Sequence, residues 1–160
     1  NYTDFVRGGA ELQGADKERM GKISERLSVL MTQFDQYVLA ETNDFQLELA
    51  TPEDRAGITE GLLQVFLNNG KNLGKEGKYI VTLSRSSIEP FLTQSTRRDL
   101  RELAFKGWKA RCDRGNAHDN NANIREILAL RAEKAKLLGY ATVADYAIAD
   151  RMAKTPDAAN

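Results

Sequence analysis

The last third of the sequence places the strongest limits on the possible folds, because helix-forming segments and helix stop signals alternate there. From Leu128 to Pro156 it reads LALRAEKAKLLGYATVADYAIADRMAKTP. Gly139 is a typical residue just beyond a helix end. Thr142, three residues before Asp145, resembles a capping box and begins a further helix, which Pro156 stops. This region therefore predicts two consecutive helices joined by a short turn.

A longer helix is predicted nearer the start of the chain. Its apolar residues alternate in steps of three and four, at Met20, Ile23, Leu27, Leu30, Phe34 and Tyr37. This spacing is typical of an a/d seam. The seam covers fewer than three heptads, so an antiparallel partner within the domain is the better interpretation than a free coiled coil.

Two short strands are predicted around a helix. Phe45, Leu47 and Leu49 alternate with polar residues, and KYIVTL at 78–83 is rich in β-branched and aromatic residues. The helix between them ends with Gly70 at its C′ position. The strands could form a parallel βαβ unit or an antiparallel ribbon, and the sequence does not decide the direction.

The remaining segments also favour helices. Ser86 or Ser87 can cap a short turn that tolerates Pro90 near its start. Ser95 caps a longer helix with a predicted buried face of Leu100, Leu103, Ala104 and Trp108. The stripe expected on the next helix consists of Ile124, Ile127, Leu128, Ala132, Ala135 and Leu138.

Together these patterns predict a mainly α fold, a bundle-like arrangement of long antiparallel helices with one small two-stranded β element. The predicted helices cover residues 16–42, 59–69, 96–112, 120–138 and 143–153, and the strands cover 45–49 and 78–83. We expect residues 1–160 to form a single compact helical part of a larger chain.

Composition excludes several classes of protein. Lys plus Arg equals Asp plus Glu, at 23 each, so no net charge attracts nucleic acids or anionic membranes. No apolar run approaches the roughly 20 residues that span a bilayer, and the start, NYTDFVRGGA, is not a signal peptide. Cys112 is the single cysteine, which excludes an internal disulfide and favours a reducing compartment. We expect a cytoplasmic protein.

Both ends of the sequence favour a fragment of a longer polypeptide. The start carries Phe5, Val6 and Ala10, which look like the last turns of a helix that begins earlier. The end, MAKTPDAAN, has no closing element. The alternative interpretation is the removal of a tag or of disordered ends.

The sequence contains few candidates for catalytic or metal-binding residues. His118, the single histidine, lies in a polar loop beside Asp119, whereas a zinc site needs three or four converging ligands. We expect an exposed loop residue. Cys112 could be a nucleophile only if His118 turned back towards it, and a half-buried small residue is the more ordinary interpretation. We predict no catalytic, cofactor-binding or metal-ligating residue in this chain.

One basic segment raises the alternative hypothesis of nucleic-acid binding. Arg97 to Arg114 reads RRDLRELAFKGWKARCDR, with Phe105 and Trp108 among the basic groups. Such interleaving can bind phosphates and stack bases. However, opposite charges recur at helical spacing, as in Arg98 and Glu102, which is typical of a solvated face. We therefore predict no nucleic-acid binding and a buried Trp108.

Four segments in this order carry a family resemblance: QYVLAETNDFQLEL, GKYIVTLSRSSIEPFL, STRRDLRELAFKGWKAR and HDNNANIREILALRAEKAKLLGYATVADYAIADRMAKTP. The chain resembles the N-terminal half of the zinc metallopeptidases related to thimet oligopeptidase and oligopeptidase A. Within that family it is most similar to bacterial peptidyl-dipeptidase. The most specific combination is LRAEKAKLLGY, ADY and DRMAKTP with the upstream REL element.

The resemblance implies a mostly helical, channelled enzyme that hydrolyses short peptides. In the family an H-E-x-x-H helix and a further Glu hold zinc, and the first Glu activates the metal-bound water. No segment here matches that pattern, and His118 matches none of its ligands. The resemblance thus implies a non-catalytic part of the channel wall that partners the C-terminal catalytic part, with zinc in the parent enzyme and none bound here. The alternative is a stand-alone helical interaction module.

Overall fold

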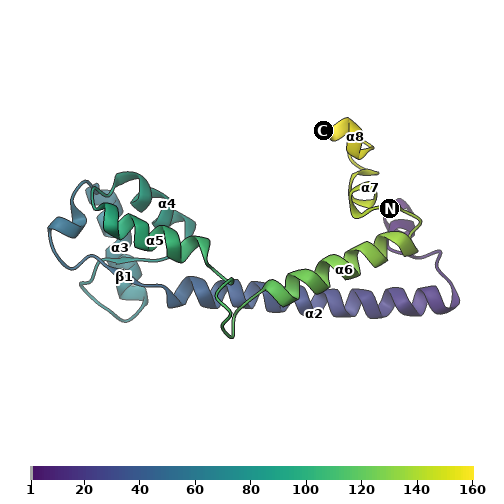
Figure 1. Ribbon diagram of the computed structural model, residues 1–160, viewed down its shortest axis with the longest axis horizontal. Coiled ribbons are helices and arrows are strands. Elements are labelled where there is room, and N and C mark those ends of the chain that lie inside the picture. Colours follow the sequence, from purple (N-terminus) through teal and green to yellow (C-terminus); the bar gives the residue numbers. More distant parts are fainter. Residues whose placement is uncertain (1) are drawn as a thin grey trace. The chain divides into compact units, whose positions relative to one another are not determined.

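The computed structural model describes residues 2–160, which form mainly helices (Figure 1). In chain order the helices are α1 (Tyr2–Arg7), α2 (Gly14–Asp44), α3 (Glu60–Asn72), α4 (Arg85–Gln94), α5 (Arg98–Lys109), α6 (Asn121–Leu137), α7 (Val143–Ile148) and α8 (Pro156–Ala159). The strands are β1 (Leu47–Glu48) and β2 (Ile80–Val81), and η1 (Glu53–Arg55) is a 3₁₀ turn. The predicted mainly α fold with one small β element is confirmed.

The chain groups into two compact units. Unit 1 combines the residues up to Phe34 with Asn121–Asn160, and unit 2 is Asp35–Asn120. Helix α2 contributes its first part to unit 1 and its last part to unit 2. The expectation that residues 1–160 form a single compact part stays a prediction.

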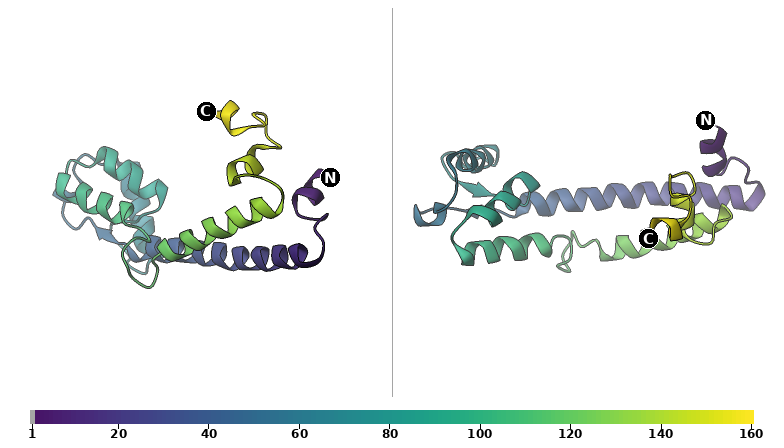
Figure 2. Two further views of the ribbon diagram at one scale, coloured as in Figure 1. Left: turned by 45° about the vertical axis from the view of Figure 1, so that its right-hand side comes forward. Right: turned by 90° about the horizontal axis from the view of Figure 1, so that it is seen from above.

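Unit 1 is organised around an antiparallel helix pair. The views of Figure 2 show α6 beside the first part of α2. Arg19 pairs with Glu133 and Arg26 with Glu126, so the two helices are antiparallel. Three of the predicted seam residues are buried, namely Met20, Ile23 and Leu30. The antiparallel partner expected for the seam is therefore α6.

Unit 2 contains the larger apolar core. Strands β1 and β2 pair antiparallel, with Leu47 opposite Val81 and Glu48 opposite Ile80. This settles the direction that the sequence left open. A two-stranded sheet is marginal alone, and here helices α3 and α4 pack against it. Phe66 of α3 and Phe91 of α4 meet edge to face, with ring centroids 6.1 Å apart.

Gly70 does not end its helix as predicted, because α3 continues to Asn72. A Cβ atom at Gly70 would lie 2.1 Å from the carbonyl oxygen of Lys78. Glycine is therefore needed inside the helix so that the loop before β2 can approach it. Gly74, with φ at +71°, supplies the left-handed turn beyond the helix end.

Helix α4 is longer than the predicted short turn, and its N-cap is Ser84 rather than Ser86 or Ser87. Pro90 lies inside the helix. Ser87 is buried instead, where its Oγ accepts a hydrogen bond from the Thr82 amide at 3.0 Å. Burial of Ile88 and Phe91 on one face of α4 explains how tertiary packing outweighs the proline.

The last predicted helix is shorter than 143–153. Its capping box is confirmed, since Thr142 Oγ1 accepts from the Asp145 amide at 3.1 Å and Asp145 Oδ2 from the Thr142 amide at 2.9 Å. Helix α7 ends at Ile148, and Lys154 adopts a φ of +65°. Pro156 starts α8 instead of stopping a helix, because proline suits the first helical position after the Thr155 cap.

The apolar faces of α5 and α6 differ from the predicted stripes. On α5 only Ala104 is fully buried, Leu100 and Trp108 are half-buried, and Leu103 is 52% exposed. Trp108 packs against the core of unit 2 without being enclosed by it. On α6 Ile127 and Ala135 are buried, whereas the predicted stripe residues Ile124, Leu128 and Ala132 are exposed.

No helix in the described part of the chain has both the length and the apolar character needed to cross a bilayer.

Candidate functional site

The loop that follows α5 carries His118 and Cys112, the two residues with the most reactive side chains. His118 Nδ1 lies 3.9 Å from Asp44 Oδ2, and its ring lies 5.5 Å from that of Tyr37. Both neighbours are on the last part of α2. No hydrogen bond or ion pair joins His118 to Cys112 anywhere in residues 2–160. The structure therefore does not form the nucleophile–base pair that catalysis at Cys112 would need.

Cys112 is held as a structural residue. Its side chain is buried, its carbonyl oxygen accepts a 2.9 Å hydrogen bond from the Asn120 amide, and its φ is +59°. Burial, and then the nearby charge of Glu41, raise the pKa of the Cys112 thiol. A raised pKa leaves little thiolate near neutral pH, so the residue is poorly suited to nucleophilic attack.

Glu41 is a buried charge that the sequence patterns did not single out. It is 3% exposed, and its Oε1 accepts a 2.6 Å hydrogen bond from Asn116 Nδ2. Oε2 lies 3.4 Å from Arg114 Nε without a hydrogen bond. Glu41 stands four residues after Tyr37, so extending the seam by one step would have indicated its burial. It ties the loop after α5 to α2, which is a structural role.

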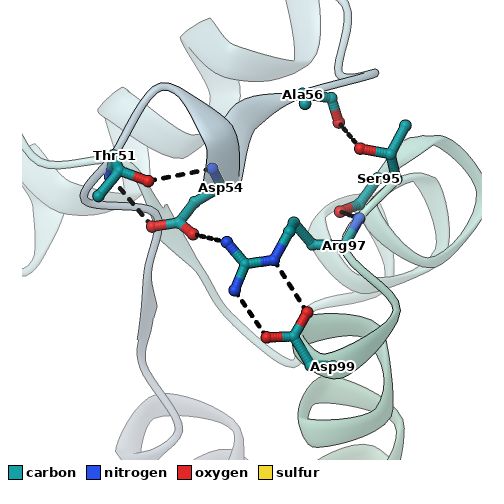
Figure 3. Close-up of polar contacts among 7 residues, drawn as sticks. Thr51, Asp54, Ala56, Ser95, Arg97 and Asp99 are labelled. Carbon is teal, nitrogen blue, oxygen red and sulfur yellow. Dashed lines mark hydrogen bonds and ion pairs between the residues drawn. The ribbon is translucent and has the colours of Figure 1, made fainter.

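Carboxylates neutralise part of the basic segment. Arg97 donates to Asp54 Oδ1 at 2.5 Å and to Asp99 through two hydrogen bonds of 2.9 and 2.7 Å (Figure 3). Lys106 pairs with Glu102 at 2.6 Å. The hydrogen bonds from Arg97 hold the pKa of Asp99 down at about 2. The charges that are paired contribute little attraction for phosphates, and the absence of nucleic-acid binding stays a prediction.

The same network fixes the turn that precedes α3. Thr51 Oγ1 accepts from the Asp54 amide at 3.3 Å, and Asp54 Oδ2 accepts from the Thr51 amide at 3.0 Å, as Figure 3 shows. The amide of Thr51 is the main cause of a lowered pKa at Asp54. The amide of Thr96 donates to the Ala56 carbonyl at 3.1 Å. Arg97 therefore joins two segments of unit 2 that are more than 40 residues apart.

The donor atoms do not form a metal site. In the span from Tyr2 to Asn160 no three His, Cys, Asp or Glu side chains converge on one point. The zinc that the family resemblance implies therefore has no ligand set among these side chains.

Similarity to known proteins gives the context for this structural arrangement. Residues 91–160 match the sequence model of "Peptidase family M3". The chain is 33% identical over 159 residues to "Dipeptidyl carboxypeptidase" of Escherichia coli (strain K12), which covers 99% of this chain and 23% of the relative. It is 32% identical over 158 residues to the protein of that name from Salmonella typhimurium, with 99% and 23% covered.

The chain is a relative of the M3 peptidases. A third match, "Oligopeptidase A" of Haemophilus influenzae, is 33% identical over 160 residues and covers 98% of this chain. The resemblance inferred from the four sequence segments is thereby confirmed. The chain spans about a quarter of the length of these M3 relatives, 23% in each case.

Proposed function

We propose that this chain is a non-catalytic helical part of a zinc-dependent peptidyl-dipeptidase or oligopeptidase that hydrolyses short peptides, and that it forms part of the wall of the substrate channel. The observation that carries the proposal is the match to dipeptidyl carboxypeptidases over 99% of this chain. The metallopeptidase chemistry then belongs to residues outside the stretch of the relatives that this chain matches.

The residues with reactive side chains support a scaffold role. Cys112, Glu41 and Arg97 each take part in contacts that hold loops to helices. His118 packs on Tyr37 beside Asp44. Side chains in such contacts fix the positions of loops relative to helices. A channel wall depends on a fixed backbone of this kind.

The alternative of a stand-alone interaction module through the α2 seam has less support. Met20, Ile23 and Leu30 are buried within unit 1, so these seam residues are not available to an outside partner. A cytoplasmic location and the absence of nucleic-acid binding stay predictions.

The first test of this proposal is the coding sequence downstream of Asn160. We expect the reading frame to continue and to encode an H-E-x-x-H segment. The complete polypeptide should then release dipeptides from short peptides with a free C-terminus, and a chelator should abolish this activity. The 160-residue chain with added zinc should show no turnover.

Two outcomes would contradict the proposal. A frame that closes directly after Asn160 would rule out a part of a larger peptidase. Metal-dependent hydrolysis by the purified 160-residue chain would show that the reactive residues lie within it.

A further inference from the structure

The helix pair of unit 1 has one flank that suits contact with water. Arg19 and Arg26 lie seven residues apart on α2, and Glu133 and Glu126 lie seven apart on α6. Each arginine donates two hydrogen bonds of 2.6–2.8 Å to its glutamate. The four side chains are 40–50% exposed. Along this flank the charges are solvated and mutually neutralised.

Another part of the α2–α6 surface is apolar. It holds a hollow of about 200 Å³, lined by Met31, Phe34, Ile124, Ile127, Leu128 and Arg131. Met31 is 37%, Ile124 41% and Leu128 59% exposed. Large apolar side chains gathered at the surface of one hollow are typical of an interaction site, whereas scattered ones are ordinary.

A second hollow of about 280 Å³ adjoins the first at Arg131. It is lined by Leu27, Arg131, Lys134, Val143, Tyr146 and Ala147. We call the two hollows together the Arg131 groove. The groove is bounded by α2, α6 and α7, all within unit 1.

The size and charge of the groove indicate what it can accept. Each hollow is smaller than the roughly 300 Å³ at which small-molecule sites begin, so it suits single side chains. Arg131 and Lys134 are the charged residues that line it. Within the part of the chain that the structure describes, neither has an ion-pair partner, and Arg131 contacts the sulfur of Met31 at 3.6 Å. A ligand with apolar anchors and a carboxylate would complement both properties.

We propose that the Arg131 groove is the docking surface for an amphipathic helix of the catalytic part of the same polypeptide. That helix places two apolar side chains, one turn apart, in the hollows and a carboxylate opposite Arg131. The inference rests on the proposed function. It is supported by the length of the relatives, of which this chain covers only 23%. A second copy of the chain fits less well, because a two-fold contact through this patch brings the basic residues of one copy against those of the other.

The three methionines offer a direct test, because their side chains differ in exposure. Met20 is 6%, Met31 37% and Met152 100% exposed. Oxidation by dilute hydrogen peroxide follows exposure and can be measured for each methionine by peptide mass spectrometry. We expect Met31 to oxidise roughly tenfold more slowly in the complete polypeptide than in the 160-residue chain. Met20 should stay slow in both, which verifies that unit 1 is folded.

A matched pair of variants in the complete polypeptide sharpens the test. Leu128→Glu introduces a charge inside the groove, whereas Val29→Glu introduces one on α2 at a site that is 51% exposed and outside it. Val29 lies two residues from Met31, about 200° round the helix. Leu128→Glu should restore the oxidation rate that Met31 has in the 160-residue chain, and Val29→Glu should leave Met31 protected.

The outcomes separate the two proposals. Equal oxidation of Met31 in an active complete polypeptide and in the 160-residue chain would overturn the docking surface and leave the proposed function standing. Protection of Met31 that survives Leu128→Glu would also overturn it. A reading frame that ends at Asn160 would overturn both.

Discussion

The two units differ in how they are held together. In the described residues twelve of the seventeen buried hydrophobic residues belong to unit 2 and five to unit 1. Unit 2 surrounds Phe66 and Phe91 with a continuous core. Unit 1 relies on one buried seam, two bidentate ion pairs and an arginine held between tyrosines. A unit with its own core can be stable alone, whereas a helix pair with an uncovered apolar groove gains stability from a partner.

The largest expected effect tests the core of unit 2. Phe66→Ala removes a fully buried ring that meets Phe91, and we expect a loss of about 3–5 kcal/mol of unfolding free energy. Trp108 is the single tryptophan and packs against this core, so its fluorescence in a urea titration reports on unit 2. Its emission should be blue-shifted in the folded chain.

The control for this variant is Leu103→Ala, at a side chain that is 52% exposed, which should change stability by less than about 0.5 kcal/mol. If Phe66→Ala and Leu103→Ala had similar urea midpoints, the stability of unit 2 would not depend on the core around Phe66 and Phe91.

The second effect tests the close approach at Gly70. Gly70→Ala places a Cβ atom against the Lys78 carbonyl oxygen, and the displacement of this backbone should cost about 1–3 kcal/mol. Gly61→Ala in the same helix meets nothing within 4 Å, and it should be neutral or stabilise unit 2 by up to about 1 kcal/mol. Urea titrations of both variants measure the difference. A neutral Gly70→Ala would refute the account of why this helix carries an interior glycine.

Gly70 also shows where sequence patterns stop being informative. A glycine at the end of an apolar helical stretch is typical of a helix stop, and nothing local reveals that the loop before β2 needs the space above it. Helices α2, α3, α5, α6 and α7, the two strands and the Thr142 capping box follow from local spacing and were predicted, whereas α8 was not. The exposure of Ile124 and Leu128 was not, because an apolar stripe on a helix does not show whether this chain contains the surface that covers it.

In the candidate site, too, local sequence patterns predict some features and miss those that depend on distant partners. That His118 and Cys112 do not form a catalytic pair could be expected from their lack of convergent partners. The roles of Glu41 and Arg97 could not, because their partners lie 75 and 43 residues away in the sequence. Contacts between residues so far apart in the sequence depend on how whole helices and loops pack, which no short sequence pattern encodes.

The third effect tests the arginine of unit 1. The Arg7 side chain is 13% exposed, donates to the Tyr146 carbonyl oxygen at 2.6 Å and lies 4.7 Å from the Tyr146 ring centroid. Arg7→Lys keeps the charge but loses the planar stacking, at a cost of about 1–2 kcal/mol. We expect faster hydrogen exchange of the amides of α7 and unchanged Trp108 fluorescence. Arg151→Lys, at a side chain that is 76% exposed, is the matched control and should change neither. Equal exchange in the two variants would mean that Arg7 does not hold α7.

The smallest effect concerns pH and belongs to unit 2. Arg97 lowers the pKa of Asp99 to about 2, below the value of about 3.9 of an unfolded aspartate. A carboxyl group with a lowered folded pKa stabilises the fold above its unfolded pKa, and this contribution is lost as the pH falls through the folded pKa. The urea midpoint reported by Trp108 fluorescence should therefore decrease as the pH is lowered from 4 to 2. This decrease should be less steep in Asp99→Asn than in the unchanged chain. The hydrogen exchange of α7 should not distinguish these two proteins over that range, because Asp99 and Arg97 both lie in unit 2. An equal acid slope of the Trp108 midpoint in both would show that the Arg97–Asp99 pair does not stabilise unit 2.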